Sequence, residues 1–289
     1  MEKERISDIL LLCVAAIWGI NFVAMKFLLV HISPVNLVLV RFFIGSILLF
    51  FLLLFSGDVK VPLRDFIYLC FLGVIGITMY QFFFTYALKY ASVTNVSIII
   101  NSAPLYGGIL SSFFGFEKFN KKKILCILPG FFGVFIIVTK GTFSLESGNA
   151  TGNILAVVSS ILWALYTILS KPFLDRHSPL KVTTYSMITG SVLLIPFAPF
   201  CLDLNELMML SAAGWAIMSF TVVFSIVIAF YLWYRGVKKI GPSQTIIYQY
   251  SIPVFAAFFA YLLIHEQLYF SQLMGASIVF LSLWLARRS

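Results

Sequence analysis

The hydrophobic residues of this chain are gathered into separate blocks, and most blocks are long enough to cross a membrane as a helix. A hydrocarbon layer of about 30 Å needs roughly 20 apolar residues in a helix. Charged residues make up only 11% of the 289 residues, whereas soluble domains carry roughly 25%. The sequence therefore predicts an all-α polytopic membrane protein. We expect ten transmembrane helices, near residues 8–29, 34–55, 66–88, 92–116, 123–139, 152–171, 181–201, 209–234, 241–264 and 268–286.

Positive charge is distributed unevenly between these blocks. The net charge of +9 could indicate nucleic acid as a partner, but with the N-terminus inside, 16 of the 20 Lys and Arg residues fall at cytoplasmic ends. Cytoplasmic loops of membrane proteins carry such an excess. We therefore expect a protein of the cytoplasmic (inner) membrane with both termini cytoplasmic, in contact with lipid and not with nucleic acid. The remaining four of the 20 Lys and Arg residues are expected on the opposite side of the membrane, and they are Lys26, Arg41, Lys89 and Lys140.

The two halves of the chain repeat each other. At an offset of 145 residues the matched pairs are Trp18 with Trp163, Lys26 with Lys171, Ser33-Pro34 with Ser178-Pro179, and Gly45-Ser46 with Gly190-Ser191. At an offset of 149, after one insertion, Lys89, Asn95, Ser102, Pro104 and Glu117 match Lys238, Gln244, Ser251, Pro253 and Glu266. Five spans per half is an odd number, so we expect the second half to be inverted. Inverted repeats are typical of transporters that alternate access to a central site.

Several of these residues form motifs that resemble a known family. The motifs are Trp18-Gly19-Ile20-Asn21-Phe22, Lys26, Pro34, Arg41-Phe42, and the pairs Pro104 with Pro253 and Glu117 with Glu266. With them the chain resembles the EamA family of the drug/metabolite transporter superfamily over essentially its whole length. The resemblance implies two EamA repeats of five helices each, which we place at residues 1–141 and 142–289. It also implies export of amino acids or related small metabolites.

The second half departs from this pattern. Trp163-Ala164-Leu165-Tyr166 stands where the first half has Trp18-Gly19-Ile20-Asn21, and Ser186 stands where the first half has Arg41. We therefore do not expect the two halves to be functionally equivalent.

Polar and aromatic residues inside the spans form stripes at helical spacing. Polar groups are costly in lipid, so they should face the bundle interior or a wet cavity. A competing interpretation is that they only join helices to one another. Because mixed aromatic and polar stripes recur in both halves, we favour a central substrate cavity. The candidate substrate-binding residues are Trp18, Asn21, Arg41, Gln81, Asn101, Trp163, Tyr166, Tyr248 and Gln249.

Arg41 allows two interpretations from its position about two turns into the second span. Its guanidinium could hold a substrate carboxylate through a two-pronged contact. Alternatively, its long side chain could extend to the membrane surface.

Four further residues are candidates for gating or coupling. Pro104 and Pro253 lie within spans and leave the carbonyls of Ile100 and Gln249, four residues earlier, without their helical partners. Such a break could be a hinge, a binding site or a static kink. Glu117 and Glu266 end the fourth and ninth spans, where they could lock gates, carry protons or cap the next segment.

Reactive constellations typical of an enzyme are not evident in the sequence. It has no paired-Asp motif, no His-rich helix, no Ser-His-Asp set within the spans and no nucleotide-binding P-loop. We therefore expect no enzyme, no cofactor and no metal site. The alternatives kept open are an importer or exchanger of a nucleotide-like or other metabolite and an intramembrane enzyme. The nearly apolar fifth and tenth spans are expected at the periphery, where they could form a homodimer contact.

Overall fold

The computed structural model describes residues 2–91, 93–118, 121–141, 150–198 and 202–288. Within these ranges the regular elements are helices, and no strand occurs. Residues up to 141 form α1 (Glu2–Leu28), α2 (Pro34–Ser56), α3 (Leu63–Gly73), the π-helical η1 (Val74–Met79), α4 (Tyr80–Tyr90), α5 (Val93–Ile100), α6 (Ala103–Phe113) and α7 (Lys121–Thr139).

Residues from 150 onward form a similar series. Its elements are α8 (Ala150–Leu169), α9 (Lys171–Arg176), α10 (Pro179–Val192), the 3₁₀ turn η2 (Ile195–Phe197), α12 (Leu204–Met208), α13 (Ala212–Phe220), the π-helical η3 (Thr221–Ile228), α14 (Ala229–Ile240), α15 (Pro242–Ile246), the 3₁₀ turn η4 (Ile247–Tyr250), α16 (Ser251–Ile264) and α17 (Phe270–Arg288).

Eight helical segments in the described residues are long and apolar enough to span a membrane. They are Ile6–Met25, Pro34–Ser56, Leu63–Ala87, Asn95–Phe113, Ala150–Arg176, Ala212–Ile240, Pro242–Ile264 and Phe270–Arg287. Large apolar side chains also face outward, for example Phe55, Phe113 and Phe270, which are 87%, 80% and 76% exposed. Water-soluble monomers rarely expose so much apolar surface. The expectation of an all-helical, multi-pass membrane protein is confirmed.

Two of the ten predicted spans are shorter than expected. The apolar part of α7 covers only Leu125–Thr139. Helix α10 begins at Pro179 and ends at Val192, where the span predicted for 181–201 should continue. Residues 195–197 instead form a 3₁₀ turn with Pro196, which cannot donate a backbone hydrogen bond. Residues 199–201 lie outside the described part of the chain. Ten spans therefore stay a prediction.

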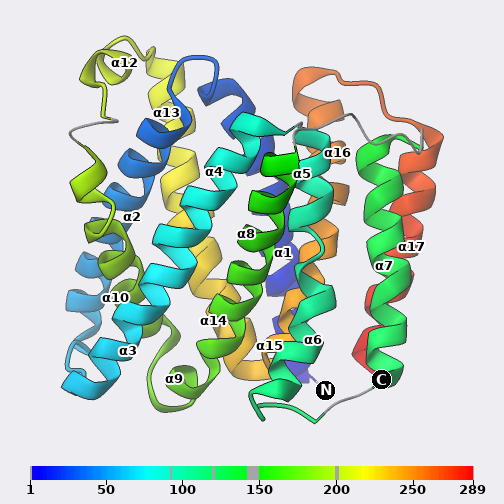
Figure 1. Ribbon diagram of the computed structural model, residues 1–289, viewed down its shortest axis with the longest axis horizontal. Helices are drawn as coiled ribbons and strands as arrows, with labels where there is room; N and C mark the ends of the chain where they lie inside the picture. Colours follow the sequence, from blue (N-terminus) through cyan, green and yellow to red (C-terminus); the bar gives the residue numbers. More distant parts are fainter. Residues whose placement is uncertain (1, 92, 119–120, 142–149, 199–201, 289) are drawn as a thin grey trace.

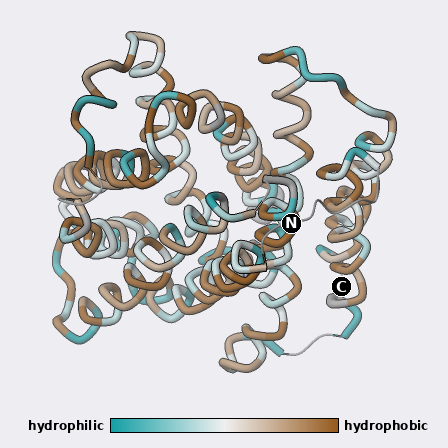
Figure 2. Tube along the Cα trace, turned by 45° about the horizontal axis from the view of Figure 1, so that its top comes forward, coloured by the Kyte–Doolittle hydropathy of each residue, from teal (hydrophilic) through white to brown (hydrophobic). Residues whose placement is uncertain are grey.

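The helices form one bundle with α7 and α17 side by side at one edge (Figure 1). Both chain termini lie at the same end of the bundle, here called the terminus end, and α12 lies at the opposite, far end. Within the bundle, α1 packs on α14 and α16, α2 packs on α10, and α4 packs on α8. Hydrophobic residues dominate the helices, whereas hydrophilic residues gather in several connecting turns (Figure 2).

Close backbone approach explains the pairing of α7 with α17. A Cβ atom added at Gly133 would lie 2.7 Å from the carbonyl oxygen of Gly275, and one added at Gly275 would lie 2.7 Å from that of Gly133. In lipid no hydrophobic force drives helices together, so their association depends on close packing, which small residues at such crossings allow. Because α7 and α17 lie at one edge, the interior of the bundle is formed by the other helices.

Candidate functional site

Arg41 lies inside the bundle and does not reach the surface. It is only 6% exposed, so the interpretation that its side chain extends to the membrane surface is wrong for this structure. Its Nε donates to Thr221 Oγ1 at 3.1 Å, and its two terminal nitrogens donate to Asn21 Oδ1 and to Met25 Sδ, both at 3.0 Å. These contacts bring α1, α2 and η3 together around one guanidinium.

All three acceptors of Arg41 are neutral. In the part of the chain that the structure describes, no carboxylate lies within 4.0 Å of its guanidinium. A guanidinium has five N–H donors, and a thioether sulfur is a weak acceptor. Buried charges are normally paired, because the loss of hydration costs several kcal/mol per ion. The site therefore has the chemistry of a receptor for an anionic oxygen group.

The equivalent contact in the second half has no charge. Tyr166 and Ser186 occupy the positions 145 residues after Asn21 and Arg41. The Tyr166 hydroxyl and Ser186 Oγ are 3.0 Å apart, and both residues are fully buried. A neutral hydroxyl pair thus joins α8 to α10. Since this neutral pair suffices there, packing alone does not require the charge of Arg41.

An aromatic cluster lies one turn of α1 away from Asn21. The ring of Trp18 is 5.6 Å from Trp163, 5.2 Å from Trp233 and 5.8 Å from Phe230, measured between centroids. Its indole Nε1 donates to the carbonyl oxygen of Ser225 at 3.0 Å. Trp163 and Trp233 are only 4% and 1% exposed. These rings pack against one another and offer an apolar, polarisable surface beside the Arg41 site.

The aromatic residues of α14 were not among the sequence candidates. Phe230, Trp233 and Tyr234 all face the cluster, and the Tyr234 ring is 5.4 Å from that of Tyr166. The signal for them is the spacing i, i+3, i+4, i+7 that they form with Val237, which marks one face of a helix. The neighbouring residues in the sequence are also apolar, so the alternative interpretation was that these aromatic side chains face lipid.

Both π-helical segments contribute to this region. Thr221 and Ser225, which contact Arg41 and Trp18, belong to η3. In η1, a Cβ atom at Gly76 would come within 2.1 Å of the Tyr166 ring. Short π-helical turns are rare and occur frequently at functional sites. Here η3 supplies the hydroxyl that contacts Arg41 and the carbonyl that contacts Trp18, and η1 supplies the glycine that lies against Tyr166.

Helix breaks occur next to Pro104 and Pro253. α5 ends at Ile100 and α6 begins at Ala103, while the 3₁₀ turn η4 precedes Ser251. The Ile100 carbonyl oxygen accepts from Gln249 Nε2 and from Ser160 Oγ, each at 3.1 Å. Gln249 therefore supplies a partner for the carbonyl that Pro104 leaves without one. The contact also joins the two broken helices across the middle of the bundle.

Asn101 lies in the break between α5 and α6. Its Nδ2 donates to the carbonyl oxygen of Ser97 at 2.8 Å. Its Oδ1 and the Oε1 of Gln249 are buried without a hydrogen-bond partner among the described residues. Buried amide oxygens of this kind need an explanation, such as water or a bound molecule.

Gln81 and Tyr248 do not join the residues around Arg41. Gln81 lines a largely apolar crevice of about 50 Å³ between α2 and α4, together with Val38, Phe82 and Thr85. The Tyr248 hydroxyl donates to Asp8 Oδ1 at 2.7 Å. Asp8 precedes Trp18 by ten residues, which is about 15 Å along α1.

The two glutamates at span ends each connect the two halves. Glu117 accepts hydrogen bonds from the backbone N–H of Ser243, at 3.2 Å, and from the Ser243 hydroxyl. Glu266 forms an ion pair with Lys140 at 2.9 Å, and both side chains are partly exposed. Glu117 thus contacts the start of α15 in the other half, and not the segment that follows it in the chain, which the capping interpretation concerned. Their roles in gating or proton coupling stay predictions.

The family follows from comparison with known proteins. The family model described as the EamA-like transporter family matches residues 5–139 and 150–288, which is nearly the whole chain. This chain belongs to the EamA-like transporter family. The resemblance inferred from the sequence motifs is therefore confirmed, and a membrane transporter is indicated.

Relatives within the EamA-like family align over nearly the full length. An uncharacterized transporter of Archaeoglobus fulgidus is 29% identical over 281 residues, covering 96% of each chain. The uncharacterized transporter YyaM of Bacillus subtilis is 28% identical over 250 residues, covering 85% of this chain and 82% of the relative. A crystal structure with 16% identity superposes with a TM-score of 0.81 and covers 97% of this chain and 96% of the other. That likeness concerns the fold alone.

Proposed function

We infer that this protein is a secondary transporter that moves small carboxylate-bearing metabolites out across the cytoplasmic membrane by alternating access. Amino acids and related compounds are the proposed substrates. The observation that carries this proposal is the buried guanidinium of Arg41, which is surrounded by three neutral acceptors. A substrate carboxylate would supply the missing negative charge through a two-pronged contact. The aromatic cluster at Trp18 would receive the apolar part of the same molecule.

Many transporters achieve alternating access with two similar, inverted halves, and several contacts support that arrangement here. Trp18 packs on Trp163, and the hydroxyl oxygens of Ser46 and Ser191 are 2.8 Å apart. Both pairs are residues that the sequence matches at an offset of 145. Matched residues of an inverted repeat meet where the two halves are related by a twofold axis. We therefore propose ten spans in two inverted halves of five, with the terminus end in the cytoplasm.

The positive charges support the same orientation. Lys60, Arg64, Lys238 and Lys239 all lie at or near helix ends on the terminus end of the bundle. An excess of Lys and Arg is typical of the cytoplasmic side. The outward direction of transport rests on the family resemblance, because residues alone do not fix the direction of the driving force.

The test is solute counterflow into liposomes that contain the purified protein, with a panel of labelled amino acids, other carboxylates and nucleotide-like metabolites. Arg41→Gln should lower saturable flux at least about tenfold, because a charge-assisted hydrogen bond is worth about 1.5–3 kcal/mol. Lys122→Gln, which changes an exposed lysine of α7, is the matched control and should leave the flux unchanged.

A stability measurement separates function from folding. Because Arg41 has only neutral partners, its replacement by Gln leaves no opposite charge buried and unpaired. Arg41→Gln should therefore keep the thermal unfolding midpoint of the wild type in detergent. If Arg41→Gln transports normally, the guanidinium has no role in substrate binding. If only phosphorylated metabolites are exchanged, the alternative of a nucleotide-like substrate replaces the proposed one.

A further inference from the structure

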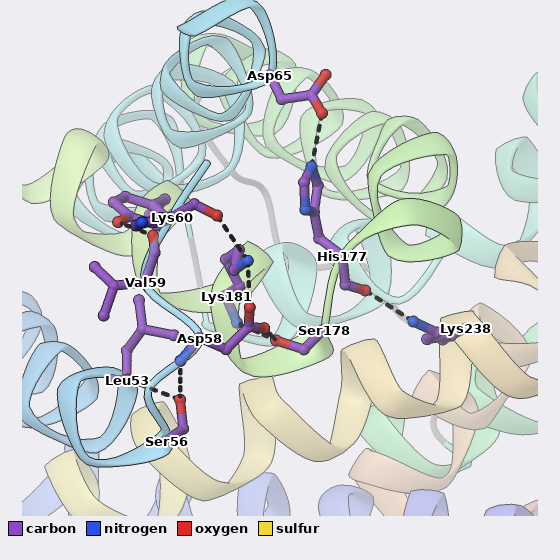
Figure 3. Close-up of polar contacts among 11 residues, drawn as sticks. Leu53, Ser56, Asp58, Val59, Lys60, Asp65, His177, Ser178, Lys181 and Lys238 are labelled. Atoms are coloured by element: carbon purple, nitrogen blue, oxygen red, sulfur yellow. Dashed lines mark hydrogen bonds and ion pairs between the residues drawn. The ribbon is translucent and has the colours of Figure 1, made fainter. Parts of the chain in front are cut away.

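A polar tie at the terminus end joins the two halves of the molecule. Asp58, in the turn after α2, accepts from Ser178 Oγ at 3.0 Å and from Lys181 Nζ at 2.6 Å (Figure 3). Lys181 Nζ also donates to the carbonyl oxygen of Lys60 at 2.9 Å. The hydrogen bond from Lys181 holds the pKa of Asp58 below its usual value. The start of α10 is therefore fastened to the turn between α2 and α3.

A second tie lies at the far end. Glu206 Oε2 accepts from the Ser33 hydroxyl at 2.9 Å, from the Ser33 backbone N–H at 2.8 Å and from Asn36 Nδ2 at 2.9 Å. Asn36 Nδ2 also donates to the carbonyl oxygen of Asp203 at 2.8 Å. The start of α2 is therefore fastened to α12, in the connection that follows α10.

The two ties are built from matched residues. Ser33 and Ser178 are 145 residues apart, and so are Asn36 and Lys181. In each tie the serine hydroxyl donates to a carboxylate, and the second residue donates to that carboxylate and to a backbone carbonyl of the same connection. Each donor pair belongs to one half and each acceptor pair to the other. The same arrangement of donors and acceptors thus occurs at both ends. The half that supplies the donors at one end supplies the acceptors at the other.

Neighbouring contacts strengthen the tie at the terminus end. Asp65 accepts from His177 Nε2 at 2.6 Å and pairs with Arg176 at 3.0 Å. Lys238 Nζ donates to the His177 carbonyl oxygen at 2.8 Å (Figure 3). His177 lies in the turn between α9 and α10, but its side chain is only 10% exposed and bonds to the other half.

The carboxylates of both ties are accessible to water. The Asp58 side chain is 49% exposed, and Glu206, in the middle of α12, is partly exposed. Water can therefore replace the partners of both carboxylates when the helices separate. Individual hydrogen bonds contribute only about 0.5–1.5 kcal/mol net. Such contacts suit a closure that must form and break in every cycle.

We propose that the two ties are paired latches, one at each end of the substrate pathway, and that they open one at a time. This proposal rests on the transport function proposed above. Release of Ser33 and Asn36 from Glu206 opens the far end, and release of Ser178 and Lys181 from Asp58 opens the terminus end. Both latches are closed in this structure, and Arg41 is only 6% exposed.

The test measures the separation of the two halves at each end and needs no substrate. Nitroxide labels at His31 and Met208 report on the far end, and labels at Arg64 and Lys239 report on the terminus end. All four positions are exposed and belong to opposite halves in each pair. Pulsed dipolar spectroscopy on the full chain in lipid nanodiscs gives the distance distribution of each pair. The background lacks the native thiols, which are Cys13, Cys70, Cys126 and Cys201.

Glu206→Gln should add a longer-distance population at the far end and leave the terminus end closed. Asp58→Asn should do the reverse. Ser33→Ala removes one donor and keeps Asn36, so it should produce a smaller longer-distance population than Glu206→Gln. Asp203→Asn and Asp175→Asn are the matched controls and should change neither pair. The Asp203 carboxylate accepts from Asn205 N, and Asp175 pairs with Lys171 in α9, so each bonds within its own half.

Unchanged distances in both latch variants would overturn the proposal. Equal widening at both ends in either variant would also overturn it, because the ties would then be braces of the whole bundle. Failure of the transport proposal gives a different result. In that case the liposomes show no flux for any solute, while the two ends still open separately in the labelled variants.

Discussion

Arg41 carries a charge that its matched residue, Ser186, lacks. The two halves otherwise make corresponding contacts here, Asn21 with Arg41 and Tyr166 with Ser186. A substrate bound between them would meet a cation on one side and hydroxyl groups on the other. A small molecule with one carboxylate and an apolar or aromatic remainder fits this asymmetry better than a symmetric dianion does.

Sequence reasoning selected several of the residues that lie together at this centre. Trp18 and Asn21 share one face of α1 because they are separated by three positions, and both meet side chains from other helices. Thr221 was not selected, because a single hydroxyl in an apolar run is most simply explained as a helix-joining residue. Its contact with Arg41 depends on the π-helical turn, which has no clear sequence signature.

The far-end latch gives a pH prediction for Glu206. Hydrogen bonds from Asn36 and from the backbone and hydroxyl of Ser33 lower the pKa of Glu206 from its ordinary value of 4.5. Because the pKa of Glu206 is lowered in the closed latch, its carboxylate favours the closed latch at a pH above the ordinary pKa. This contribution is lost as the pH falls through the lowered pKa. The distance between labels at His31 and Met208 should therefore stay constant from about pH 7 to about pH 5.

Opening of the far end within that pH range would contradict this account of Glu206. The matched control is Glu206→Gln, whose amide does not titrate. It should give the same distance distribution at all these pH values.

At the scale of elements, the proline breaks in two helices are the feature that the sequence predicted best. α5 ends four residues before Pro104, and its last carbonyl oxygen, at Ile100, bonds to Gln249 of the other half. The prolines determine where the backbone hydrogen bonds fail. The identity of the new partner was not predictable, because it depends on how the two broken helices cross.

Pro104→Ala should restore a continuous helix between α5 and α6. The variant gains a backbone hydrogen bond, so its thermal unfolding midpoint should equal or exceed that of the wild type. If the break is a hinge, the rate of counterflow should fall by about tenfold or more, since a hinge absorbs the backbone change of each cycle. The control is Pro129→Ala in the peripheral helix α7, which should transport at the wild-type rate.

Normal flux in Pro104→Ala would identify the break as a static kink. A loss of flux in Pro129→Ala as well would indicate that proline replacement disturbs the bundle in general.

At the scale of the whole molecule, hydrophobicity and charge predicted the class correctly. Long apolar blocks became membrane-spanning helices, and the nearly apolar segments became α7 and α17, which lie at one edge of the bundle (Figure 1). Pairing of these two helices depends on Gly133 and Gly275. The latches were not predictable in the same way, because hydropathy carries no information about which turns meet at the ends of the bundle.

In the proposed function, the cation of Arg41 binds the carboxylate of a transported solute. The most direct measurement is counterflow of matched pairs of solutes, each acid compared with its own neutral amide, in wild-type and Arg41→Gln liposomes. We expect saturable flux of the acid in the wild type, weak flux of the amide, and loss of the difference between them in Arg41→Gln. Equal flux of acid and amide in the wild type would contradict the claim.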